Sequence, residues 1–224
     1  MASDGQRDQA ILASWEINAS PWVRAVRERQ IASREQVTNQ AIISTLTELA
    51  PSSLLDVGCG EGWLCRTMRA QGCDCLGIDA IESLVSAARE KGGHYRCLRY
   101  EDLSDADFSQ RFDCAVCNFS LIGKGATELV FAAMAELLSH GGHLVVQTLH
   151  PHATTHTSSG WQDGSWAGFS EDFQQPAPWY FRTLNDWRAL FQNHNFTIEQ
   201  ELAPSASDGS LPLSLILVGR LNSQ

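Results

Sequence analysis

A glycine-rich segment carries the strongest chemical signal in this sequence. The segment LLDVGCGEG runs from Leu54 to Gly62 and places glycines at alternate positions, Gly58, Gly60 and Gly62. Glycines let the backbone turn sharply and let a ligand approach main-chain atoms without a Cβ in the way. The amphipathic stretch from Leu64 predicts a helix, whose N-terminal N–H groups and positive dipole end favour a polar ligand. This pattern predicts a loop that binds a nucleotide-like molecule.

The spacing of the glycines separates two classes of ligand. A dinucleotide fingerprint reads G-x-G-x-x-G, and its third glycine is needed for close packing of helix on strand. Counted from Gly58, that position is Trp63, and Gly62 falls one residue early. The match to a dinucleotide loop is therefore poor.

With Asp56 two residues before the first glycine, the segment resembles the main cofactor motif of the class I S-adenosylmethionine-dependent methyltransferases. The motif D-x-G-x-G-x-G is complete from Asp56 to Gly62. The resemblance implies that the cofactor is S-adenosylmethionine. It also implies that the loop residues hold this cofactor: Asp56, Gly58, Cys59, Gly60, Gly62 and Trp63.

Two further acidic positions follow in the order that this family uses. Asp79, followed by Ala80, ends the next apolar run, and a carboxylate there can accept both ribose hydroxyls. NAD would use the same carboxylate, so Asp79 indicates an adenosine ligand without choosing between the two cofactors. After the next run come Glu101, Asp102 and Leu103, where the resemblance implies Asp102 as acceptor for the adenine amino group and Leu103 as a backbone contact. The alternative for this turn is a solvated acidic surface.

The run FDCAVCNFSL from Phe112 resembles the fourth strand of the family and the start of its active-site loop. The resemblance implies that Asn118 and Phe119 face the methionine end of the cofactor. The D/N-P-P-Y/F-type motif of the DNA and protein amine methylators is absent, because residues 118–121 read NFSL. Cys117 follows Val116 rather than a proline, so the cytosine-methylating Pro-Cys pair is absent as well. Both departures favour a small-molecule methyl acceptor.

Histidines after the fifth apolar run are the candidates for a general base. His150 and His152 follow HLVVQTL directly, and His156 lies in the same loop. A structural role, contact with the substrate and metal binding all stay open for them. No carboxylate lies between these histidines, and no metal site is predicted.

Aromatic residues are concentrated between residues 151 and 180. They either wall a pocket for an apolar or planar methyl acceptor, or pack a long loop onto the sheet. The set comprises Trp161, Trp166, Phe169, Phe173, Trp179 and Tyr180. By analogy with the family, Trp15, Trp22 and Arg34 would cover the cofactor as a lid.

These residues require an α/β framework to position them. Between residues 53 and 150, short apolar runs alternate with amphipathic segments, which predicts a parallel sheet covered on both faces. With the two C-terminal strand candidates, the resemblance implies a Rossmann-like, seven-stranded, mostly parallel sheet in the order 3-2-1-4-5-7-6. Residues 1–51 are predicted to form an N-terminal helical cap, with Ser33 and Gln36 as a capping box and Pro51 after the last helix. Residues 52–224 would form the methyltransferase domain, with an aromatic-rich insertion at about 151–178.

Composition sets the limits of this interpretation. The chain has 224 residues, 43% of them hydrophobic, and a formal net charge of −10, which is typical of one globular domain and unfavourable for a nucleic-acid binder. The arginines at positions 24, 27 and 29 form the densest basic group and suit a solvated helix face. No apolar run is long enough to span a bilayer, and no secretory signal is evident. The seven cysteines suit reduced thiols. We therefore expect a cytoplasmic monomer or homodimer without membrane contact.

The function predicted from the sequence is the transfer of a methyl group from S-adenosylmethionine to an oxygen or nitrogen atom of a small molecule. The alternative is a catalytically silent, methyltransferase-like module that binds the cofactor or a protein. A nicotinamide-dependent dehydrogenase is a third interpretation, which the glycine spacing disfavours.

Overall fold

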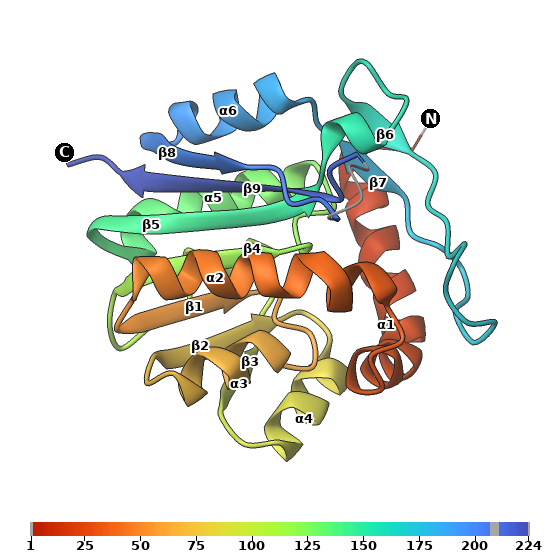
Figure 1. Ribbon diagram of the computed structural model, residues 1–224, viewed down its shortest axis with the longest axis horizontal. Helices are drawn as coiled ribbons and strands as arrows, with labels where there is room; N and C mark the ends of the chain where they lie inside the picture. Colours follow the sequence, from red (N-terminus) through yellow and green to blue (C-terminus); the bar gives the residue numbers. More distant parts are fainter. Residues whose placement is uncertain (1, 207–210, 224) are drawn as a thin grey trace.

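The structure is a computed structural model that describes residues 2–206 and 211–223. Seven strands form one sheet in the order β3-β2-β1-β4-β5-β9-β8 (Figure 1). Strands β1 to β5 are parallel, whereas β9 pairs antiparallel with both β5 and β8. The predicted fold class and strand arrangement are confirmed, and only the numbering differs, because two short strands of the insertion are β6 and β7.

The bounds of the elements follow the alternation expected from the sequence. The sheet strands are β1 (Ser53–Val57), β2 (Asp74–Asp79), β3 (His94–Cys97), β4 (Phe112–Asn118), β5 (Leu138–Leu149), β8 (Phe196–Leu202) and β9 (Ser214–Leu221). The α-helices are α1 (Asp4–Arg27), α2 (Asn39–Leu49), α3 (Trp63–Ala70), α4 (Glu82–Glu90), α5 (Gly125–Leu137) and α6 (Leu184–Asn193). Short turns of other helix types are η1 (Arg34–Thr38), η2 (Tyr100–Asp102) and η3 (Pro151–Ala153).

Apolar layers cover both faces of the sheet. Helices α2, α3 and α4 contribute to the core on one face, and α5 and α6 to the core on the other. Strand β4 shows the alternation, because Cys114 belongs to the first core and Cys117 to the second, as the period of two predicted. All seven cysteines are free.

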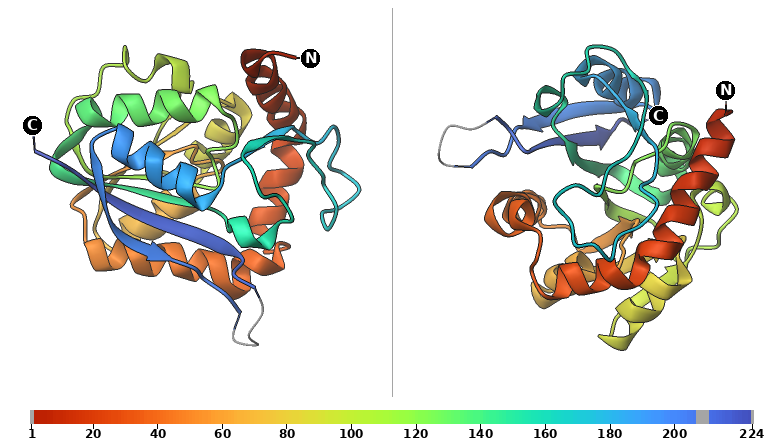
Figure 2. Two further views of the ribbon diagram at one scale, coloured as in Figure 1. Left: turned by 90° about the horizontal axis from the view of Figure 1, so that it is seen from above. Right: turned by 90° about the vertical axis from the view of Figure 1, so that its right-hand side faces the viewer.

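The N-terminal segment differs locally from the prediction. The capping box lies at Ser3 and Gln6, at the start of α1, and not at Ser33 and Gln36. Ser33 instead precedes the π-helical turn η1, which continues into α2 without a side-chain cap. Helix α1 runs across the carboxyl ends of the parallel strands (Figure 2), whereas α2 packs into the sheet core. Helix α2 ends before Pro51, as predicted, and Ala50 between them adopts a left-handed conformation.

The insertion contains regular structure that the sequence did not reveal. Strands β6 (Gly160–Gln162) and β7 (Trp179–Phe181) form a two-stranded antiparallel sheet at the two ends of a long loop. The N–H of Tyr180 donates to the carbonyl of Ile122 at 2.8 Å. This bond attaches the insertion to the loop that follows β4.

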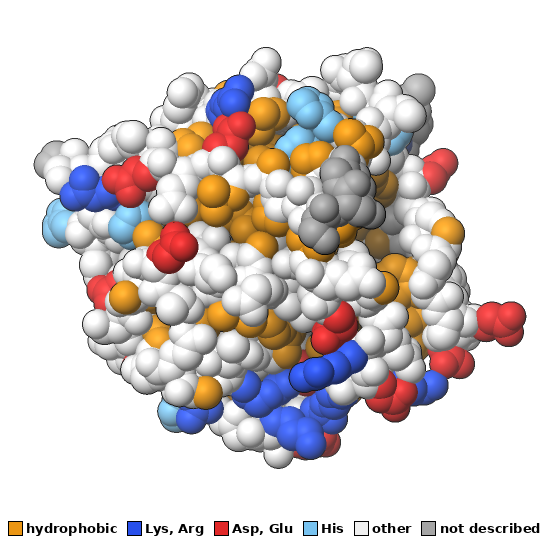
Figure 3. Space-filling model, viewed as in Figure 1, with side chains coloured by type: hydrophobic (Ala, Val, Ile, Leu, Met, Phe, Trp, Pro, Cys, Tyr) orange, Lys and Arg blue, Asp and Glu red, His pale blue; other side chains and the backbone are white. Residues whose placement is uncertain are grey.

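Eight of the sixteen lysines and arginines form ion pairs with carboxylates among the described residues. On the face shown in Figure 3 basic side chains gather at the lower edge, in the region of α3 and α4. The group predicted from the sequence is paired as well, since Arg24, Arg27 and Arg29 each contact a carboxylate. In the described part of the chain, no helix is both long and apolar enough to cross a membrane.

Candidate functional site

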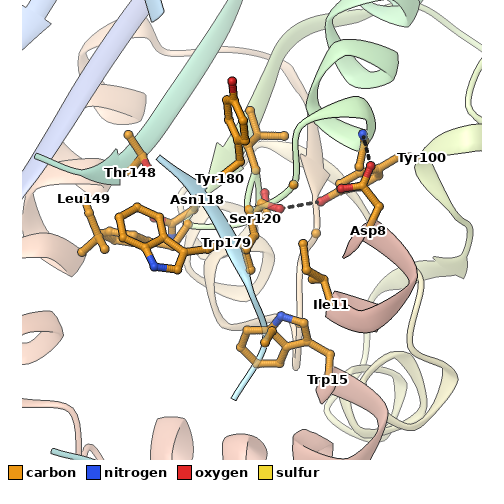
Figure 4. Close-up of a pocket in the computed structure, with 18 of the residues that line it drawn as sticks. Asp8, Ile11, Trp15, Tyr100, Asn118, Ser120, Thr148, Leu149, Trp179 and Tyr180 are labelled. Carbon is orange, nitrogen blue, oxygen red and sulfur yellow. Dashed lines mark hydrogen bonds between the residues drawn. The ribbon is translucent and has the colours of Figure 1, made fainter. Parts of the chain in front are cut away.

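A cavity of about 1380 Å³ opens at the carboxyl ends of the parallel strands. Its lining combines the glycine loop after β1, the ends of β2, β4 and β5, helix α1 and the insertion (Figure 4). Open α/β sheets bind their ligands at this edge. The topology therefore brings together residues that are far apart in the sequence.

The glycine loop turns because its three glycines adopt left-handed backbone conformations. Their φ angles are 79°, 56° and 81° at Gly58, Gly60 and Gly62, a region that residues with a Cβ rarely enter. A Cβ at Gly58 would collide with the side chain of Ser120. A Cβ at Gly60 would meet only Trp22 Nε1, at 3.5 Å, so the backbone of Gly60 borders the cavity below this ring.

A buried ion-pair network fixes the same loop. Glu61 is 1% exposed and accepts two hydrogen bonds from Arg66 Nη2, at 2.8 and 2.7 Å. Arg27, at the end of α1, contacts the same carboxylate at 3.2 Å. Glu61 occupies a variable position of the glycine motif, so its role could not be predicted from the motif.

Asp79 presents a buried carboxylate at the end of β2. Its Oδ2 accepts the N–H of Gly60 and its Oδ1 accepts the N–H of Ile81, each at 2.9 Å. Burial raises the pKa of Asp79, and these backbone hydrogen bonds oppose the rise. A carboxylate has about four lone-pair sites, so capacity remains for hydroxyl donors from a ligand.

Asp56 is even more deeply buried, with 1% of its surface exposed. It accepts the S–H of Cys65 at 3.4 Å. Burial raises the pKa of Asp56 to about 7. Asp79 and Asp56 thus differ, since Asp79 accepts two backbone N–H groups and Asp56 accepts a weak thiol donor.

Arg34 places a positive charge beside the glycine loop. Its guanidinium lies 4.9 Å from the ring centre of Trp63 and 5.5 Å from that of Trp22. Nε donates to Asn39, while Nη2 is buried and has no partner among the described residues. Burial lowers the pKa of Arg34 to about 10, so the side chain stays charged at neutral pH. The turn η1 that carries it is π-helical, a geometry that is frequent at functional sites.

The other end of the cavity is mainly apolar and aromatic, and we name it the aromatic lobe. Figure 4 shows side chains from α1, β4, β5 and β7 around it, and its defining residues are Ile11, Trp15, Asn118, Leu149 and Trp179. The Oδ1 atom of Asn118 is buried without a hydrogen-bond partner among the described residues. Phe119, the next residue, has a φ of 54°, and such strained conformations are frequent at functional sites.

A family model described as "Methyltransferase domain" matches residues 31–201, more than half of the chain. The chain belongs to this family. Membership confirms the resemblance to the class I S-adenosylmethionine-dependent methyltransferases that Asp56, the three glycines and Asp79 suggested.

Curated relatives of this methyltransferase-family chain include two ubiquinone biosynthesis O-methyltransferases. The protein from Xanthomonas euvesicatoria pv. vesicatoria is 37% identical over 114 residues, 48% of this chain and 47% of the relative. The protein from Marinobacter nauticus is 30% identical over 150 residues, 64% of this chain and 63% of the relative. The chain thus spans about half of the first relative and under two thirds of the second.

Solved structures share the fold at lower identity. One is the 1,6-didemethyltoxoflavin-N1-methyltransferase of Burkholderia thailandensis, solved with bound 1,6-didemethyltoxoflavin and S-adenosylhomocysteine. Its TM-score is 0.69 at 16% identity, and the match covers 100% of this chain and 92% of that one. An S-adenosylmethionine-dependent methyltransferase from Mesorhizobium loti has a TM-score of 0.62 at 22% identity, covering 79% and 96%. These likenesses support the fold of the methyltransferase domain.

Most of the predicted cofactor residues of this methyltransferase domain line the cavity. They are Asp56, Gly58, Cys59, Gly60, Trp63, Asp79, Ala80, Glu101, Asn118 and Phe119. In the described lining, Glu101 is present, whereas Asp102, Leu103 and Gly62 are not. Leu103 is fully buried in the core and its N–H already donates to Tyr100, at 3.3 Å. Gly62 caps α3 and lies between two lining residues, Glu61 and Trp63.

The predicted catalytic histidines come directly after Leu149 and before Ala153, two residues that line the cavity. His150 and His152 are not among the described lining residues. His150 is 5% exposed, and its Nδ1 accepts the N–H of His152 at 3.1 Å. Burial lowers the pKa of His150, which keeps the ring neutral. The described residues also contain no group of three or more side chains suited to hold a metal.

Proposed function

We propose that this chain binds S-adenosylmethionine and transfers its methyl group to an oxygen or nitrogen atom of a small molecule. The observation that carries the proposal is the continuity of one cavity from the glycine loop and Asp79 to the aromatic lobe. The curated relatives are O-methyltransferases by name, which favours oxygen, while the fold neighbour from Burkholderia methylates a nitrogen.

The residues at the glycine-loop end fit the chemical groups of this cofactor. Asp79 has remaining lone pairs for ribose hydroxyls, and Glu101 offers a carboxylate in the region where the family places the adenine contact. Arg34 offers a charged, unpartnered nitrogen for the methionine carboxylate. The bound cofactor supplies an activated methyl group on a positively charged sulfur.

The remaining task of the chain is to orient the methyl acceptor and exclude water. Helix α1 and the insertion cover the cavity, and we call these two segments its roof. Holding an acceptor in the correct orientation can lower a reaction barrier by roughly 7–11 kcal/mol. His150 and His152 lie outside the lining, so the proposal assigns them no proton transfer. The cytoplasmic location, the absence of nucleic-acid binding and the monomeric or dimeric state stay predictions.

Calorimetric titration with S-adenosylmethionine, S-adenosylhomocysteine and NAD tests the cofactor. We expect the first two to bind and NAD not to bind. Asp79→Asn should weaken binding by roughly 10- to 100-fold, because it removes a charged hydrogen-bond acceptor. Asp74→Asn is the matched control, since Asp74 begins the same strand and is exposed at its opposite end. A folded wild-type protein that binds neither adenosyl compound would contradict the proposal.

Turnover is tested separately from binding. Formation of S-adenosylhomocysteine over time, with a panel of hydroxyl and amine acceptors, distinguishes an enzyme from the catalytically silent module. Tight cofactor binding without product from any acceptor would favour the silent module.

A further inference from the structure

We propose that the methyl acceptor is a planar, unsaturated molecule that carries no negative charge and lies in the aromatic lobe. The proposal rests on the proposed function, because it names the substrate class of the same cavity. Its support comes from the size of the cavity, the construction of its walls and the distribution of charge around it.

The cavity is large enough for two ligands. Its volume of about 1380 Å³ exceeds the range of roughly 300–1000 Å³ that is common for small-molecule sites. One ligand at the glycine loop and Asp79 leaves the aromatic lobe for a second. Asn118, at the end of β4, stands among the residues of this lobe in Figure 4.

The walls of the aromatic lobe are rings held in place by neighbouring rings. Trp15 makes edge contacts with Trp22 and Trp166, at centroid distances of 5.0 and 5.8 Å. Trp179 belongs to β7 and contacts Phe181 edge-on at 6.0 Å. Rigid aromatic faces lose little conformational entropy when they bind a ligand, and they stack favourably on planar unsaturated rings.

The apolar wall between these rings is accessible at Leu149. This residue, at the end of β5, lines the cavity and is 51% exposed, whereas Ile11 of α1 lines it and is 7% exposed. An aromatic ligand would remove this apolar surface from water.

The described residues of the lobe offer no free cation to an acidic ligand. Among the described lining residues, the cationic side chains of lysine or arginine type are Arg34, Arg99 and Arg182. Arg182 is 6% exposed and donates to the carbonyls of Gly123 and Lys124, at 3.1 and 3.0 Å. Its guanidinium therefore already donates hydrogen bonds to backbone oxygens.

The other two arginines are directed elsewhere. Arg99 pairs with Glu101 at 3.2 Å, and Arg34 lies between two tryptophan rings at the glycine-loop end. The lining includes several carboxylates, among them that of Asp8, whose Oδ2 accepts the N–H of Ala126. A negative charge on the methyl acceptor would lose water without gaining a cationic partner, and Asp8 would repel it.

Binding to the protein saturated with S-adenosylhomocysteine tests the charge and shape of the acceptor. The probes are quinolinol and hydroxyindole, each beside its carboxylate derivative, and decalinol as a saturated alcohol of similar size. We expect the two neutral aromatic compounds to bind, and the carboxylates and decalinol to bind about tenfold more weakly or worse. Equal or tighter binding of the carboxylates or of decalinol would overturn the proposal, as would failure of both neutral aromatic compounds to bind.

Variants in one small sheet locate the site. Trp179→Ala should lower the affinity for quinolinol about tenfold, and Trp179→Phe should restore most of it because a planar ring remains. Trp161→Ala is the matched control, since Trp161 belongs to the partner strand β6 but is not among the described lining residues. Equal losses in the two alanine variants would overturn the placement in the aromatic lobe.

A change of charge provides a gain-of-function test. Leu149→Arg adds the missing cation at an exposed lining position, so the preference for neutral quinolinol over its carboxylate should shrink or reverse. An unchanged preference would contradict the charge argument. A separate titration with S-adenosylhomocysteine is made for the wild type and for each variant, so failure of the acceptor class with intact cofactor binding is distinguishable from failure of the proposed function.

Discussion

Arg34 is the residue whose environment is most informative at the scale of single side chains. Two tryptophan rings hold its guanidinium, and its Nη2 is buried without a partner in the described part of the chain. A buried donor without a partner destabilises the folded protein. A ligand that accepts this hydrogen bond removes that cost, which favours binding. The methionine carboxylate of the proposed cofactor fits this requirement.

Arg34→Met should therefore weaken the binding of S-adenosylhomocysteine by roughly 10- to 100-fold, because a charged hydrogen bond is lost while an unbranched side chain remains between the rings. Methylthioadenosine, which has the same nucleoside but no carboxylate, should bind wild type and variant alike. Calorimetry with both compounds separates the two effects. A parallel loss for methylthioadenosine would show that Arg34 supports the fold of the site instead.

Asp56 predicts a dependence of stability on pH. Burial raises its pKa from 3.8 to about 7 in the folded protein, so the folded state binds an extra proton between these values. The free energy of unfolding should therefore fall as pH rises through this window and stay lowered above it. Asp56→Asn removes the cost of the buried charge and should be more stable than wild type at about pH 8, on the order of 4 kcal/mol, with little gain near pH 4. Urea unfolding at both pH values measures the difference, and a gain independent of pH would refute this origin.

At the scale of elements, the sequence predicted those whose signals are local. The strands, the helix after each glycine or turn, and the glycine loop itself follow from periodicity and spacing within about ten residues. The π-helical turn at Arg34 and the pairing of β6 with β7 do not, because they depend on contacts with distant segments. Asn18 is a clear case, since its partner Gln174 lies 156 residues away.

Helix α1 and the insertion are joined by a pair of reciprocal hydrogen bonds. The Asn18 side chain is fully buried, donates to the carbonyl of Gln174 at 2.7 Å and accepts its N–H at 2.8 Å. Ser14 donates to the carbonyl of Gln175, a residue held at a φ of 43°. These bonds fix the roof of the cavity in one arrangement.

Asn18→Ala should loosen the insertion, because two backbone groups of Gln174 lose their partner, at a cost of about 1–3 kcal/mol. Limited proteolysis should then cut residues 163–178 faster than in wild type, while the sheet stays intact. Arg24→Ala is the control, since it breaks only the exposed ion pair with Asp172, worth about 0–1 kcal/mol. Equal cleavage of both variants would mean that Asn18 does not hold the roof.

At the scale of the whole molecule, α1 connects the two layers of helices across the edge where the cavity opens. Near its start, Asp8 accepts the N–H of Ala126 on α5, at 3.1 Å. At its end, Arg27 contacts Glu61 of the glycine loop and donates to the carbonyl of Ala87 on α4, at 2.7 Å. Helix α1, which covers the aromatic lobe, is thereby attached to the loop that would hold the cofactor.

This attachment predicts that cofactor binding orders the roof. Saturation with S-adenosylhomocysteine should slow amide hydrogen exchange in α1 and in residues 163–178 as well as in the glycine loop, since local opening of each would then require breaking shared contacts. Arg27→Met cuts the link while the pair between Glu61 and Arg66 remains. In this variant the glycine loop should still be protected, whereas protection of α1 should fall toward the level of the free protein. Arg29→Met is the control, because Arg29 is 80% exposed and contacts only Glu35 among the described carboxylates. Full protection of α1 in Arg27→Met would show that the roof orders independently of this ion pair.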